Sequence, residues 1–204
     1  MRIRIKKFVL VGLILALSPM ASNANLIEVS WGLFPDSQTV HIGQSFQLDL
    51  VVSGLGDGMA PSLQGFDVDI TFSDVFTIDP STVVFGTFLG DPNDSAQTNT
   101  TSQLIGTEVL WLVERSLLES LALDAIQGSS FTLATMTFTA SAVGTYIFSG
   151  DDCCGGLFLT DETTKKPGVD SAYVTVLAVP EPGTMALLGI GLAGMGLARR
   201  RRKV

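Results

Sequence analysis

Apolar and polar residues alternate with a period of two along most of the middle of this chain. The alternation is clearest from Phe46 to Val52, where apolar side chains occupy every second position, and it recurs from Phe66 to Phe72. This spacing is typical of strands that bury one face and expose the other. The predicted strands are 46–52, 63–72, 108–113, 131–138, 146–148, 158–160 and 173–177. These seven segments predict an all-β fold, an antiparallel β-sandwich of jelly-roll type whose full set is expected to be roughly eight or nine strands.

Clusters of Gly, Pro, Asp and Asn separate these segments and predict turns or loops. They cover 54–58, 79–81, 90–94 and 150–156, and the Thr- and Asn-rich segment 91–102 is expected to form a long exposed loop. The period breaks at Ala134–Thr135, where a β-bulge would fit. Residues 114–126 carry leucines at helical spacing. This segment is either a short helix or an extended crossover, and a short helix is favoured.

The first residues of the chain have the organisation of a secretory signal peptide. Four basic residues occur in the first seven positions, an apolar stretch follows from Phe8 to Leu17, and small residues surround Ala24. We therefore predict a signal peptide over 1–24 that is cleaved between Ala24 and Asn25. The remaining body, residues 25–178, has the length of one domain with a sizeable core.

The last residues form a second segment that does not belong to a folded core. Residues 184–198 carry no charge, and a helix of about fifteen residues would be ~22 Å long, shorter than a hydrocarbon core of ~30 Å. This length predicts a short transmembrane helix. The basic cluster after it, which should stay in the cytoplasm, consists of Arg199, Arg200, Arg201, Arg202 and Lys203. On these features alone, a permanent C-terminal anchor is the alternative to a sorting signal.

The order of elements in residues 179–204 is informative beyond their hydropathy. Pro180, Glu181 and Pro182 precede the Gly-rich apolar segment, and the basic cluster ends it. This arrangement resembles the PEP-CTERM sorting signal of Gram-negative bacteria. The resemblance implies that the chain is the substrate of an exosortase, a membrane peptidase, after export by the secretion machinery. It also implies transient anchoring in the inner membrane, and then release to the cell surface, outer membrane or an extracellular matrix of biofilm and exopolysaccharide.

The strand segments themselves resemble a second family. Residues 39–52 look like the opening of a cohesin-like domain, and 63–72 look like its following strand. Residues 131–140 and 144–148 are similar to two later strands of that family. The resemblance implies the cohesin fold for most of the body. Cohesins bind dockerin partners through one sheet face, and the residues here do not place that face.

Charge is distributed very unevenly. Nine of the twelve Lys and Arg residues lie in the two terminal clusters, which leaves Arg115, Lys165 and Lys166 for the body, whereas all twenty Asp and Glu lie between Glu28 and Glu181. Such an acidic surface repels nucleic acid. No cofactor is predicted, and the only metal considered is calcium, because loop oxygens are hard ligands. The candidate oxygen donors are Asp57, Asp91, Asn93, Asp94, Asp151 and Asp152.

The body lacks a recognisable catalytic constellation, so we predict no catalytic residues and no enzyme. His41 is the only histidine, and it is expected on the surface or on an edge strand. Asp67 and Asp69 would project from one strand face about 6.6–7 Å apart, a separation that a carboxylate glycosidase could use. A solvated strand face explains the pair equally well. The tryptophans Trp31 and Trp111 bear on the carbohydrate alternative. An exposed aromatic face would favour carbohydrate binding, whereas burial of both tryptophans in the core would disfavour it.

The two cysteines, Cys153 and Cys154, are adjacent within a Gly- and Asp-rich segment. Neighbouring cysteines can close only a strained vicinal ring. In an oxidising compartment the alternatives are this vicinal disulfide, which we favour, intermolecular bridges, or free thiols.

These features predict an exported, non-enzymatic structural or adhesion protein of the cell surface or matrix. The alternative is a binding module for a carbohydrate or a protein, and a carboxylate-dependent glycoside hydrolase is a more remote one.

Overall fold

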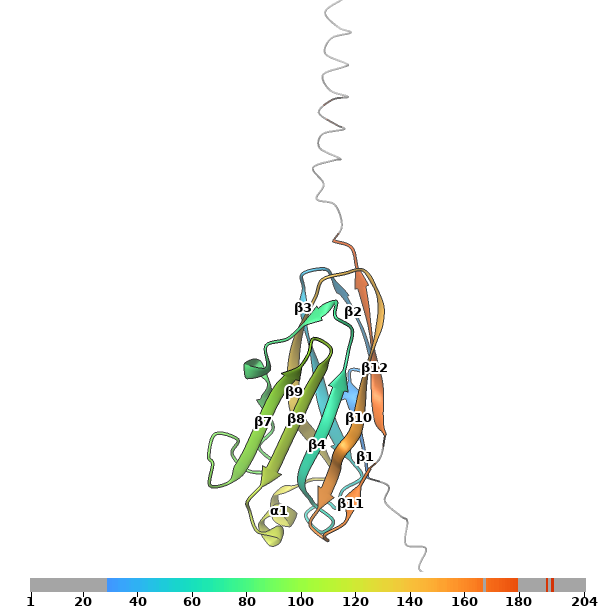
Figure 1. Cartoon of the computed structure of the whole chain (residues 1–204). Coiled ribbons are helices and arrows are strands. Elements are labelled where there is room, and N and C mark those ends of the chain that lie inside the picture. The colour runs from blue at the N-terminus through green and yellow to red at the C-terminus, as the bar shows by residue number, and fades with distance from the viewer. Residues whose placement is uncertain (1–28, 167, 180–189, 191, 193–204) are drawn as a thin grey trace, which may run out of the picture.

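The computed structural model describes residues 29–166, 168–179, 190 and 192 of the chain (Figure 1). Nine strands of the described part have five or more residues: β1 (Ser30–Phe34), β2 (Ser37–His41), β3 (Ser45–Ser53), β4 (Leu63–Thr71), β7 (Thr98–Ile105), β8 (Val109–Ser116), β9 (Ser130–Ala140), β10 (Gly144–Leu159) and β12 (Val169–Leu177). Three strands have two residues: β5 (Phe76–Thr77), β6 (Val84–Phe85) and β11 (Thr164–Lys165). A 3-10 turn, η1 (Pro80–Thr82), and one helix, α1 (Ser120–Ile126), complete the described elements.

The strands form one continuous sheet that curls into two layers, in the order β5-β9-β3-β1-β12-β10-β4-β8-β7. Strand β1 joins the layers because it pairs antiparallel with β3 on one side and parallel with β12 on the other. Strand β2 also runs parallel to β12. Figure 1 shows β3 and β9 behind β4, β8 and β10. The predicted all-β sandwich of jelly-roll type is confirmed, with these two parallel pairings added to an otherwise antiparallel sheet.

The period-two alternation accounts for the core. Leu48, Leu50 and Val52 of β3 are fully buried, and so are the apolar positions of β4, whereas their neighbours along each strand, except Gly65, are at least partly exposed. A cluster of aromatic rings connects the two layers: Phe46 of β3 lies 5.9 Å from Phe138 of β9 and 6.0 Å from Phe148 of β10, measured between ring centroids. The alternating residues therefore face one another across the sandwich, as the sequence pattern requires.

Two predicted loops are strands in the structure. The exposed loop expected over 91–102 is wrong in its second half, because β7 begins at Thr98 and pairs with β8 along its whole length. Three of its four inward positions are Thr98, Thr100 and Ser102, and only the fourth, Leu104, is aliphatic, so the apolar alternation is weak. The loop expected over 150–156 lies inside the long strand β10. There, Asp151 pairs with Asp69 and Gly156 with Asp67, so four residues of β10 oppose Val68 alone.

The bulge and the helix are both present, slightly displaced from their predicted positions. In the β3–β9 ladder, Leu50 pairs with Ala134 and Val51 with Thr132, which makes Leu133 the extra residue of a β-bulge. Of the segment 114–126, the first residues complete β8 and the last seven form α1. Helix α1 buries Leu123 and is followed by Gln127. The favoured short helix is thus confirmed for its C-terminal half.

Gln127 closes the end of the sandwich next to α1. Its side-chain oxygen accepts a hydrogen bond from the Leu63 amide at 2.7 Å, and its nitrogen donates to the carbonyls of Leu63 and Phe88 at 2.7 and 3.0 Å. The amide side chain is buried. The Gln127 side chain therefore supplies the hydrogen bonds that the Leu63 backbone would otherwise exchange with a neighbouring strand.

Both predicted sorting segments fall outside this description. Residues 1–24, with the cleavage site at Ala24 and Asn25, the motif Pro180–Pro182 and the cluster Arg199–Lys203 lie among the residues that the structure does not describe. Within the described part, no helix has the length and apolar character needed to cross a bilayer.

Candidate binding surface

One face of the sandwich, the outer face of β10, β4, β8 and β7, carries an aromatic residue at its centre. Trp111 of β8 pairs in register with Asp69 of β4 and Gln103 of β7, so that it lies in the middle of the layer. Its ring is half-buried, and its Nε1 donates a hydrogen bond to Oδ1 of Asp67 at 2.8 Å. This bond ties the indole of β8 to the neighbouring strand β4. The ring is therefore held in one orientation on the sheet surface.

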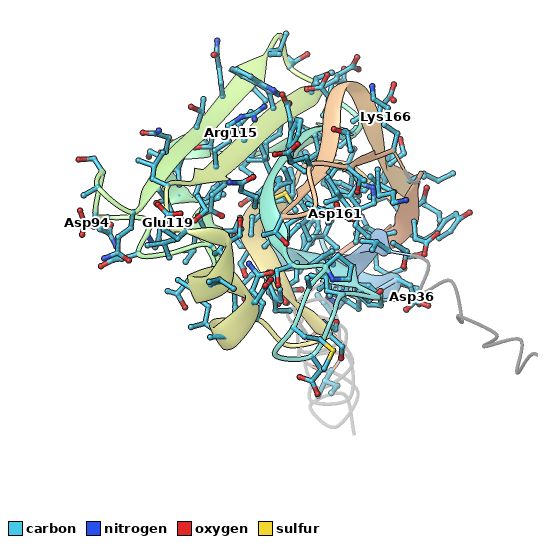
Figure 2. The ribbon with its side chains drawn as sticks, turned by 90° about the horizontal axis from the view of Figure 1, so that it is seen from below. Asp36, Asp94, Arg115, Glu119, Asp161 and Lys166 are labelled. Atoms are coloured by element: carbon cyan, nitrogen blue, oxygen red, sulfur yellow. The ribbon has the colours of Figure 1, made fainter. Side chains whose placement is uncertain are left out.

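Arg115, four residues further along β8, makes the second fixed contact of this face. Its guanidinium carbon lies 4.1 Å from the centroid of the Phe158 ring on β10. The residue between them on β4 is Gly65, and a Cβ there would lie 2.7 Å from the Glu114 carbonyl oxygen. Because position 65 has no side chain, Arg115 can cross β4 and stack on the ring. Figure 2 shows Arg115 on the ribbons of this layer.

Apolar and polar side chains surround these two anchors. Val109 and Val113 flank Trp111 on β8, and Ile105 at the end of β7 is 50% exposed. We call this surface, Trp111 with Arg115, Phe158, Asp67 and Ile105, the outer face. Aromatic and arginine side chains that are held in place and remain accessible are the residues that dominate protein interfaces.

The structure locates the predicted carboxylate pair on the outer face and separates the two tryptophans. Asp67 and Asp69 lie on the same side of β4, as predicted, and the carboxylate of Asp67 accepts a hydrogen bond from Trp111. Trp31 is 1% exposed and belongs to the core, whereas Trp111 belongs to the outer face. His41 ends the edge strand β2, as predicted.

Two of the proposed calcium donors, Asp91 and Asp94, accept hydrogen bonds within their own turns. Oδ1 of Asp91 accepts from the Asn93 amide at 2.9 Å, and Oδ1 of Asp94 accepts from the Ala96 amide at 2.9 Å. The bonds from Ala96 and Gln97 lower the pKa of Asp94. Within the described part of the chain, no three His, Cys, Asp or Glu side chains gather as metal ligands. Calcium binding stays a prediction.

Cys153 and Cys154 lie in the four-residue interruption of the β10 ladder opposite Val68. Their side chains are not among those that the structure describes, so the vicinal disulfide remains a prediction.

The sequence pattern did not identify Glu114 as an unusual residue. It follows Leu110 and Leu112 on the inward side of β8, is 1% exposed, and its Oε1 has no hydrogen-bond partner among the described residues. Burial raises the pKa of Glu114 to about 8, because desolvation disfavours the charged carboxylate. The signal was present in the alternation, which places position 114 in the buried phase of the strand.

Comparison with known proteins supports both parts of the sequence interpretation. Residues 178–203 match the family model of the PEP-CTERM protein-sorting motif. No curated protein matches the chain. Solved structures that resemble the body are cohesins at low sequence identity.

Three of them show the extent of the similarity. A type I cohesin–dockerin complex from Clostridium thermocellum aligns at 12% identity and a TM-score of 0.58, over 73% of this chain and 99% of that one. The seventh ScaB type I cohesin from Pseudobacteroides cellulosolvens aligns at 11% identity and a TM-score of 0.52, over 76% of this chain and 96% of that one. The cohesin module of a family 33 glycoside hydrolase from Clostridium perfringens aligns at 12% identity and a TM-score of 0.52, over 74% of this chain and 97% of that one. The fold is therefore that of cohesins, and the chain is an exported protein with a cohesin-like module and a PEP-CTERM tail.

Proposed function

We propose that this chain is a non-enzymatic protein of the cell surface or extracellular matrix, and that its sandwich binds a protein partner through the outer face. The observation that carries the proposal is the pair of fixed anchors on that face, Trp111 held by Asp67 and Arg115 stacked on Phe158. An exosortase-type peptidase would process the tail, and the sandwich would then act in the biofilm or exopolysaccharide matrix.

Charge supports a protein as the partner of this face. Arg115 is one of three cations in a body that holds nearly all of the chain's acidic residues. A polyanion would meet a strongly negative surface everywhere else. A protein can instead place one carboxylate on Arg115 and an apolar side chain beside Trp111, which is the usual composition of an interface centre. Dockerins are the protein partners in several of the similar structures, and a dockerin-like protein is the partner class that we propose.

Site-specific photo-crosslinking in the host tests the outer face. A crosslinking amino acid at Gln103, beside Trp111 in register, is expected to give one discrete protein adduct. The same amino acid at Gln47, exposed on the other layer, is the positional control. Arg115→Glu should reduce the Gln103 adduct at least about tenfold, as loss of a central charged contact does. Lys165→Glu reverses the charge of a residue on β11 and should leave the amount of the Gln103 adduct unchanged. Equal adducts from both positions, or no effect of Arg115→Glu, would contradict the proposal.

Mass spectrometry of the surface-exposed protein in its host tests the sorting part independently. The mature chain is expected to start at Asn25 and to end before Arg199, because the basic cluster would stay behind with the membrane segment. Surface-exposed chains that still carry Arg199–Lys203 would show that the tail is a permanent anchor.

A further inference from the structure

A second site lies where β1 turns into β2 beside β12. An open hollow of about 500 Å³ occurs there, within the range of small-ligand pockets of ~300–1,000 Å³. It is lined by Leu33, Phe34, Asp36, Ser37, Asp170, Ser171 and Tyr173. Figure 2 places Asp36 on the opposite side of the view from Arg115, so the hollow is separate from the outer face.

Local geometry brings the side chains of this hollow together. Gly32 of β1 pairs with Asp170 of β12, and a Cβ at Gly32 would lie 3.0 Å from the Asp170 Cβ and 3.4 Å from a ring carbon of Phe34. Because position 32 lacks a side chain, the Phe34 ring and the Asp170 carboxylate can lie side by side over β1. The Tyr173 amide donates to the Asp36 carbonyl at 2.8 Å, which holds the second carboxylate-bearing residue next to the second ring.

Two properties of the hollow define what it could recognise. Phe34 and Tyr173 are 48% and 49% exposed, so both rings present a free surface in a molecule that buries most of its aromatic residues. Asp36 and Asp170 are exposed carboxylates, and among the described residues neither has an ion-pair partner. Two aromatic rings beside two negative charges favour a ligand that carries a cation on a partly apolar body.

We propose that this hollow binds an amine-bearing sugar, such as a glucosamine unit. The protonated amine lies between Asp36 and Asp170, and the apolar face of the sugar ring packs on Phe34 or Tyr173. The hydroxyls of Ser37 and Ser171 accept or donate hydrogen bonds to the sugar hydroxyls. A lysine side chain offers the same cation on a thin aliphatic stem, which would leave most of the hollow unfilled and both serines without partners. The proposal does not depend on the protein partner of the outer face.

Calorimetry with the full chain in mild detergent tests this site, with glucosamine oligosaccharides as the probe. We expect saturable binding at neutral pH that weakens as salt is raised, because the contact pairs charges at the surface. The N-acetylated oligosaccharide of the same length lacks the cation and should bind at least about tenfold more weakly. A lysine-rich peptide is the third probe. Binding of the peptide with no binding of the amino sugar would overturn the assignment, and so would equal binding of the two oligosaccharides.

Matched variants locate the binding. Asp170→Asn and Tyr173→Ala should each weaken binding of the amino sugar about tenfold, whereas Tyr173→Phe, which keeps the ring, should change it little. Asp57→Asn removes an exposed carboxylate elsewhere and is the charge control. Arg115→Glu should leave sugar binding intact, so failure at one site is distinguishable from failure at the other. Unchanged binding in both Asp170→Asn and Tyr173→Ala would exclude this hollow as the site.

Discussion

Replacing Phe148 by alanine is expected to lower the free energy of unfolding by about 3–5 kcal/mol, the usual cost of deleting a buried phenylalanine ring. Phe148 belongs to β10, and its ring lies 4.8 Å from that of Phe76 and 4.9 Å from that of Phe138, which come from the other layer. It also lies 5.8 Å from Phe72, which follows β4. Removal of this ring leaves a cavity between the two layers, where neither layer can collapse without disturbing its own ladder. Domains of this size are stable by about 5–15 kcal/mol, so the loss is a large fraction of the total.

Urea unfolding followed by tryptophan fluorescence measures this effect. Phe148→Leu keeps part of the buried volume and should lose less. Ile147→Ala is the neighbouring control, because Ile147 is exposed on the opposite side of the same strand, and it should change stability by less than about 0.5 kcal/mol. A loss below about 1 kcal/mol in Phe148→Ala would show that the aromatic cluster does not hold the layers together.

Glu114→Gln is expected to change how stability depends on pH. The pKa of the Glu114 carboxyl is about 8 in the folded protein and 4.5 when the group is unperturbed. The folded chain therefore keeps a proton that the unfolded chain releases between these values. Stability falls as pH rises through this window and is greatest below it. Each pKa unit corresponds to about 1.4 kcal/mol, so the contribution over the whole window is about 4–5 kcal/mol.

The glutamine variant has a similar shape and no ionisable group at this position. The difference in unfolding free energy between Glu114→Gln and the parent chain should be small near pH 4.5. It should grow in favour of the variant up to about pH 8 and then stay constant. Glu108→Gln, at an exposed position of the turn before β8, is the matched control. A difference that does not vary with pH between 4.5 and 8 would mean that Glu114 is solvated in the folded protein.

Much of the fold could be predicted because apolar residues alternate wherever a strand covers the core. β3, β4 and β8 were located to within a few residues for this reason, and so was the bulge in β9. Strand β7 was missed because it lies at the end of the sheet, where small polar residues such as Thr98 and Ser102 suffice on the inward side. The strand character of 150–156 was missed because glycines and aspartates that usually make turns form an interruption within one long strand.

The sites were harder to predict than the fold, because each combines residues from distant parts of the chain. Trp111 and Asp67 were identified individually, but their hydrogen bond depends on the pairing of β8 with β4. Phe34 and Tyr173 belong to one hollow only because β2 runs parallel to β12, and no local pattern indicates a parallel pairing. Gly65 acquires its role only once Arg115 and Phe158 are known to lie on either side of it.

The parallel pairing of β1 and β2 with β12 also determines how the module would respond to mechanical load. Since the first and last strands point the same way, the chain enters the sandwich at one end and leaves it at the other (Figure 1). A pulling force between the two would act along the strands and shear the β2–β12 ladder. In this geometry the hydrogen bonds from Ser37 to His41 share the force instead of opening one after another. A partner that pulls on this module against a tethered C-terminal segment would therefore meet a ladder that resists extension.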